Sequence, residues 1–108
     1  MTKGMITFNL LFKKFRLRAE FATLSEFGKV LADDGFVYED SIFSRWQRGD
    51  RIPHDRGLLI SILKVFIKRG GITSLKEINS FLESAGQGYI TKREINNLSS
   101  VTHILSTK

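Results

Sequence analysis

The segment from residue 43 to residue 53, which reads FSRWQRGDRIP, is the part of the chain best suited to recognising an anionic ligand. Phe43 and Trp46 are three residues apart, and so are Arg45 and Arg48. Residues three apart lie on the same face of a helix, so the aromatic pair and the arginine pair would face different directions. The aromatic side can anchor such a helix in a core while the guanidinium groups project outward, as groove reading on nucleic acid requires.

The rest of the chain offers little to a catalytic centre. His54 and His103 are isolated, no spacing of histidines and carboxylates indicates a metal site, and no serine lies in a nucleophile-elbow context. The chain has no cysteine, which excludes disulfides, thiolate catalysis and cysteine-ligated metals. We therefore expect no enzyme activity, no metal and no cofactor.

The net charge of +6 favours an anionic partner, and its distribution along the chain is uneven. Residues 24–44 carry a net charge of −4 and lie between residues 1–23 at +4 and residues 45–69 at +5. An acidic segment in this place argues against a chain that merely coats polyanions. The alternative is that most of these charges form a solvated surface, and charge alone does not decide between the two.

Size and composition indicate one folded domain. The chain has 108 residues, of which 42% are hydrophobic, and nine are phenylalanine, enough for a single core. No apolar run is long enough for a signal peptide or a membrane span, so we expect a cytoplasmic protein with no membrane association.

Nearly every segment has helical periodicity, which predicts an all-α fold of five to six short helices. The first should span about residues 8–20, with Arg16 among the basic residues that fill its polar side. The second helix should begin at residue 24 and fade at residues 33–35, and the third should run from residue 39 or 40 to about residue 48. The fourth should begin after residues 53–55 and end at residues 68–69. The fifth should span residue 75 to about residue 85, and the sixth residue 92 to about residue 98.

Local signals support the starts and ends of these helices. Three starts have the capping-box pattern, in which a hydroxyl and a carboxylate three residues later each accept the other residue's backbone N–H: Thr23 with Glu26, Ser74 with Glu77, and Thr91 with Glu94. Gly35 and Gly49 are placed to end the second and third helices. In the fifth helix we expect Leu75, Ile78, Phe81, Leu82 and Ala85 to face inward.

From residue 15 to residue 53 the chain resembles the lambda-repressor-like helix-turn-helix family of phage Cro and repressor proteins. The resemblance rests on Thr23 and Glu26 at the start of the second helix, on Phe27-Gly28, on residues 43–46, and on the exit RGDRIP at residues 48–53. It implies a helix-turn-helix core over residues 1–71. Residues 72–98 should form a two-helix extension packed on the same domain, where it either completes the core or supplies a dimer surface. Over residues 99–108 the helical pattern weakens, which predicts a frayed tail.

One departure from the family pattern falls at the turn itself. Between Leu31 and Phe43 the chain carries about five more residues than is usual, so either the second helix runs longer or the turn is a real loop. The acidic residues of this stretch should lie away from the DNA backbone or cap the third helix: Asp33, Asp34 and Glu39.

The resemblance implies sequence-specific binding of double-stranded DNA as a transcriptional regulator, with a recognition helix over about residues 39–48 in the major groove. Its base-reading positions correspond to Asp40, Ser41, Ser44 and Arg45 of this chain. Its phosphate-contacting positions correspond to Thr23, Ser25, Arg48 and Arg51. Phe43 and Trp46 are expected in the core.

Half-sites one DNA turn apart imply a homodimer. The rival interpretation is a protein-interaction module that keeps the helix-turn-helix scaffold without binding DNA, and the acidic insertion supports it. The sequence is silent on the operator and on any small-molecule effector.

Overall fold

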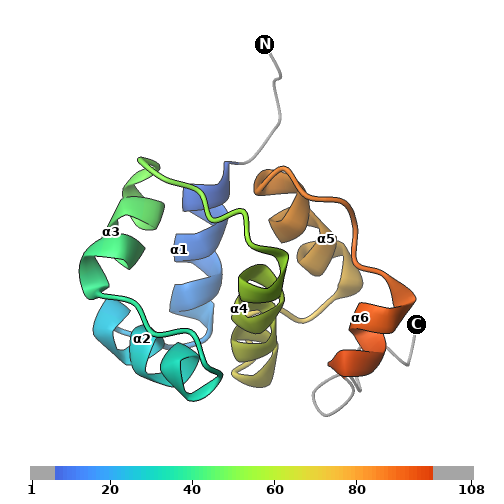
Figure 1. The fold of residues 1–108 in the computed structure, drawn as a ribbon, viewed down its shortest axis with the longest axis horizontal. Coiled ribbons are helices and arrows are strands. Elements are labelled where there is room, and N and C mark those ends of the chain that lie inside the picture. The colour runs from blue at the N-terminus through green and yellow to red at the C-terminus, as the bar shows by residue number, and fades with distance from the viewer. Residues whose placement is uncertain (1–6, 99–108) are drawn as a thin grey trace.

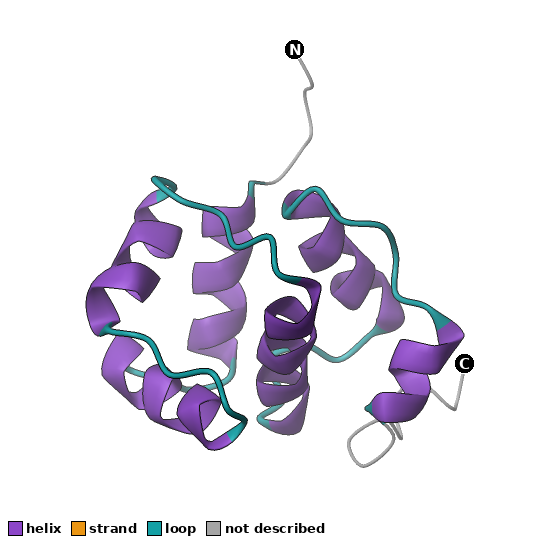
Figure 2. Ribbon diagram, in the orientation of Figure 1, coloured by secondary structure: helices purple, strands orange, loops and turns teal. Residues whose placement is uncertain are grey.

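The computed structural model describes residues 7–98, and the regular secondary structure of these residues is entirely helical. The predicted all-α fold of five to six short helices is therefore confirmed, whereas the predicted tail at 99–108 lies outside the described residues. None of the described helices combines the length and the apolar character needed to cross a membrane. The helices are α1 (Phe8–Arg18), α2 (Leu24–Asp33), α3 (Asp40–Arg48), α4 (Arg56–Lys68), α5 (Leu75–Ser84) and α6 (Lys92–Asn97) (Figures 1 and 2).

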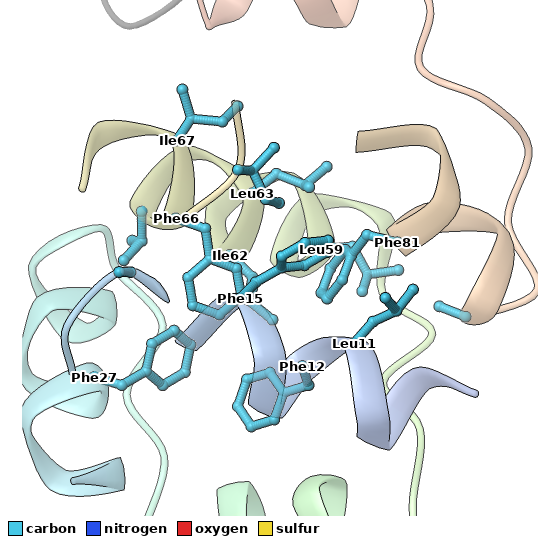
Figure 3. Packing of buried hydrophobic residues seen from close by; sticks show 14 of the residues in the cluster. Leu11, Phe12, Phe15, Phe27, Leu59, Ile62, Leu63, Phe66, Ile67 and Phe81 are labelled. Atoms are coloured by element: carbon cyan, nitrogen blue, oxygen red, sulfur yellow. The ribbon is translucent and has the colours of Figure 1, made fainter. Parts of the chain in front are cut away.

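Buried aromatic rings on α1 connect the other helices into one core. The ring of Phe12 lies 5.4 Å from that of Phe27 on α2 and 5.8 Å from that of Trp46 on α3. Phe66 on α4 lies 6.1 Å from Phe12, and Phe81 on α5 lies 6.1 Å from Phe66 (Figure 3). Helix α5 therefore shares the core that supports α2 and α3, and Leu98, which directly follows α6, is also part of it, although Figure 1 shows α6 and α3 at opposite ends of the molecule.

The helix starts follow the predicted capping signals with one correction. The reciprocal bonds predicted for Thr23 with Glu26 and for Thr91 with Glu94 are both present. The Ser74 hydroxyl accepts the N–H of Glu77, but the Glu77 carboxylate accepts the N–H of Thr73 at 2.9 Å. The reciprocal half of that prediction was wrong, because the second oxygen of Glu77 pairs at 2.7 Å with Arg18, which holds the carboxylate against α1.

Two predictions about the faces and ends of helices were also wrong. Leu75 is 45% exposed, because it is the first residue of α5 and the buried residues of this helix begin only at Ile78. Helix α1 ends at Arg18 because Glu20 takes a left-handed conformation (φ 65°). That change of direction carries Phe21 into the core, where it is 1% exposed.

The connection between α2 and α3 is a loop of residues 34–39, and so α2 does not run longer. Asp34 fastens this loop to α4, since its carboxylate accepts hydrogen bonds from the Ser61 hydroxyl at 2.6 Å and the Lys64 ammonium at 3.0 Å. These two bonds lower the pKa of Asp34. Glu39 precedes α3 but makes no capping hydrogen bond with its side chain. Of the three acidic residues expected to lie away from DNA or to cap α3, Asp34 therefore ties the loop down instead.

Candidate nucleic-acid interface

Helix α3 is held in the molecule by its aromatic side, as the spacing predicted. Phe43 is fully buried and Trp46 is 2% exposed. The Phe43 ring lies 5.3 Å from that of Phe27 on α2, while Trp46 packs edge-on against Phe12 of α1. Contacts with two different helices leave α3 little freedom to rotate about its own axis.

The opposite side of α3 is polar and accessible. Successive residues of a helix are turned by about 100°, so Ser41, Ser44, Arg45 and Arg48 occupy an arc of about 100° that points directly away from the buried aromatic pair. Ser41, Arg45 and Arg48 are exposed and Ser44 is half-buried. We call these four residues the reading face. Asp40, also exposed, is the first residue of α3 and lies to one side of this arc.

Helices α2 and α3 cross close to their N-termini. A Cβ atom at Gly28 would lie 2.7 Å from Cε2 of Phe43, so only glycine allows this approach without a shift. Gly28 is the fifth residue of α2 and Phe43 is the fourth of α3, which puts the crossing about one helical turn from each start. The N-terminal turns of α2 and α3 therefore lie close together.

The two candidate phosphate contacts at the start of α2 differ in what is available to a ligand. Ser25 is exposed and forms no hydrogen bond with a described residue. The Thr23 hydroxyl accepts the N–H of Glu26 at 3.1 Å. The Glu26 carboxylate in turn accepts the N–H groups of Ala22 at 2.9 Å and of Thr23 at 3.4 Å. The Thr23 hydroxyl and three of the backbone N–H groups at this helix start are thus already engaged in the cap, and Ser25 is the better placed of the two.

Arg48 has two side-chain partners that the sequence did not indicate. Its Nε donates to Oδ2 of Asp50 and its Nη1 donates to Oγ of Ser44, both at 2.9 Å. The structure therefore brings Arg48 next to Ser44 on the reading face. The contact with Asp50 could have been predicted from the sequence, because Arg48 and Asp50 flank a glycine that ends a helix.

Arg51 lies beyond the end of α3 and is exposed. It lines a hollow of about 330 Å³ on the flank of α3 next to the reading face. The hollow is formed by Tyr38, Ile42, Trp46, Arg51, Ile52, Pro53, His54, Asp55 and Leu58.

Arg16 was wrongly expected on the polar side of α1, since it is only 6% exposed. Its Nη1 donates to the carbonyl of Phe21 at 2.6 Å, and its Nε donates to the side-chain oxygen of Gln47 on α3 at 3.0 Å. Burial lowers the pKa of Arg16. The burial of Arg16 could have been predicted from its position four residues after Phe12, which places both side chains on the same side of α1.

The charges around the reading face are balanced rather than uniformly positive. Three acidic side chains on or next to α3 are exposed, those of Glu39, Asp40 and Asp50. Three basic side chains there are also exposed, those of Arg45, Arg48 and Arg51. Attraction for an anion must therefore come from individual guanidinium groups and not from a broad field. Among the described residues no group of three or more metal-ligating side chains comes together.

Comparison of the chain with protein-family models, with curated proteins and with solved structures gives no significant match.

Proposed function

We propose that the protein binds double-stranded DNA in a sequence-specific way, as a transcriptional regulator of the lambda-repressor-like type. The observation that carries the proposal is the reading face: two serines and two arginines project from a helix whose other side is buried against α1 and α2. An α-helix with its side chains is about 10–12 Å across, which matches the width of the major groove of B-DNA.

Each side chain then has a role that its chemistry allows. Arg45 offers two N–H donors to O6 and N7 of a guanine, while Ser41 and Ser44 can donate to or accept from base edges. Asp40 can accept from the amino group of a cytosine. Ser25 and Arg51 contact phosphates on either side of the groove, with a smaller part for Thr23, whose hydroxyl oxygen is engaged in the helix cap.

A single reading helix makes few contacts, so we propose that the protein binds as a homodimer on two half-sites about one DNA turn apart. The symmetry of the operator should then mirror the two-fold symmetry of the dimer. Neither a metal nor a cofactor is needed for this recognition.

The rival function, a module that binds another protein, is favoured by the hollow beside α3. Tyr38 and Ile52 contribute to it and are 38% and 37% exposed, so apolar surface is accessible there. Balanced charge around α3 also reduces attraction to DNA phosphates. This interpretation predicts that the reading face can be changed without affecting the partner's affinity.

The deciding experiment begins with selection of bound duplexes from a random DNA pool, followed by fluorescence anisotropy titration of the selected duplex. Arg45→Ala should weaken binding to that duplex about tenfold or more, because a bidentate base contact is lost. Arg93→Ala is the matched control, since Arg93 is an exposed arginine of α6, at the opposite end of the molecule from α3. No enriched sequence, together with no binding to any duplex at micromolar protein and low salt, would support the rival.

A further inference from the structure

Arg48 differs from the two other exposed arginines near α3 in being held at two points. Asp50 accepts from its Nε and Ser44 accepts from its Nη1, both at 2.9 Å. Arg45 and Arg51 make no hydrogen bond or ion pair with any described residue. The guanidinium plane of Arg48 is thus oriented before a ligand arrives, which reduces the side-chain entropy lost on binding.

The backbone around Gly49 holds Asp50 in place. Gly49 adopts the left-handed conformation (φ 87°), which allows the N–H of Asp50 to reach the carbonyl of Arg45 at 2.9 Å. The N–H of Gly49 donates to the carbonyl of Trp46 at 3.2 Å, so the two bonds together form a Schellman motif. Asp50 therefore projects from a closed turn, and its carboxylate can act as a stable support for Arg48.

This support makes Arg48 a poor phosphate anchor. A phosphate that approached Nε would meet the negative charge of Asp50, 2.9 Å from that nitrogen. The O6 and N7 acceptors of guanine are uncharged and do not suffer this repulsion. Five N–H groups belong to the guanidinium, and three remain after Asp50 and Ser44 are satisfied, with at least one on each terminal nitrogen. A bidentate contact with a base edge needs one N–H group from each of these two terminal nitrogens.

We propose that Asp50 is a positioning residue that holds Arg48 beside Ser44 on the reading face, so that Arg48 reads a guanine instead of anchoring a phosphate. The inference rests on the proposed DNA binding and names a specificity-determining pair within it. It assigns Arg48 a role different from the phosphate contact implied by the family resemblance.

The test compares four proteins: the wild type, Arg48→Lys, Asp50→Asn and the control Asp33→Asn. Asp33 is an exposed aspartate at the end of α2 without a described ion pair, so its amide variant removes the same charge elsewhere. Anisotropy titrations use the selected duplex, derivatives in which each base pair is replaced in turn, and a random duplex. Thermal melting by circular dichroism verifies that all variants fold.

If the inference holds, the wild type discriminates about tenfold or more against replacement of one particular G·C pair. Arg48→Lys and Asp50→Asn should lose most of this discrimination at that pair alone. Asp50→Asn should also bind the random duplex more tightly, because a negative charge has been removed near phosphates. Asp33→Asn should leave the base preference unchanged.

Two outcomes would contradict the inference. A uniform change of affinity on all duplexes for Arg48→Lys and Asp50→Asn would return Arg48 to the phosphate contacts while leaving the proposed function intact. Absence of binding by the wild type to every duplex would overturn the proposed function and this inference with it. The two failures are therefore distinguishable in the same set of titrations.

Discussion

The Nε of Arg16 in α1 donates a hydrogen bond of 3.0 Å to the side-chain oxygen of Gln47 in α3. The same guanidinium reaches the carbonyl of Phe21, so one nearly buried arginine connects α1, α3 and the connection that leads to α2. Gln47 lies next to the buried Trp46 in sequence. The polar bond and the aromatic contact therefore fix the same stretch of α3.

Replacement of Arg16 by methionine should destabilise the protein by about 2 kcal/mol, because it keeps most of the side-chain volume but leaves the carbonyl of Phe21 without its charged donor. Urea denaturation at pH 7 measures this change in the free energy of unfolding. Arg93→Met, at an exposed site on α6, should change it by less than about 0.5 kcal/mol. Equal effects of the two substitutions would show that the Arg16 bonds contribute nothing to stability.

Gly28→Ala should destabilise the protein although alanine is the better helix former. The intrinsic gain is about 1 kcal/mol. A Cβ only 2.7 Å from Phe43 must displace a fully buried ring, and such overpacking costs about 1–3 kcal/mol. Gly57→Ala in α4 is the control, since its nearest neighbour would lie at an ordinary 3.5 Å and that variant should be neutral or more stable. Urea denaturation measures the free energy of unfolding of both variants. A Gly28→Ala variant more stable than the wild type would contradict the tight crossing of α2 and α3.

The ion pair of Arg56 and Glu94, which ties α6 to α4, should make stability depend on pH in the acid range. The Arg56 guanidinium lowers the pKa of Glu94 from 4.5 to about 2. Because the folded-state pKa is the lower one, the stabilisation is complete above about pH 4.5 and is lost as the pH falls towards 2. Its size at pH 7 is on the order of 1 kcal/mol, given partial exposure of both groups.

Glu94→Gln should therefore be less stable than the wild type at pH 7 and nearly as stable at pH 2, as measured by urea denaturation at a series of pH values. Arg56→Gln should lose the same pH-dependent part and cost more at every pH, since Arg56 also donates to the carbonyls of Gly88 and Tyr89. Parallel pH profiles for wild type and Glu94→Gln would rule out this contribution.

Arg45→Ala and Arg51→Ala should affect DNA binding in different ways. Loss of Arg45 from the reading face should relax the preference at one base pair, whereas loss of Arg51 should weaken binding to all duplexes alike and reduce the salt dependence by about one counterion. Anisotropy titrations at several salt concentrations on the selected and random duplexes separate these effects. Equal losses on both duplexes for Arg45→Ala would remove it from the base contacts.

The sequence by itself determined the features that depend on neighbouring residues. The helix starts at Leu24, Leu75 and Lys92 follow from capping hydroxyls three residues before a glutamate, which act within a single turn. Burial of Phe43 and Trp46 follows from helical spacing alone. The family resemblance, not the spacing, made the four residues of the reading face candidates for DNA contact, with Arg48 as a phosphate contact.

Only the tertiary structure decided which side chains meet across the chain. The burial of Arg16 against Gln47, the Arg18 partner of Glu77 and the attachment of Asp34 to α4 join residues 27 to 59 positions apart. No local pattern specifies such contacts, because they depend on the angles at which helices pack. Asp50 and Arg48 are only two residues apart, yet their contact also depends on a three-dimensional feature, the closed turn at Gly49.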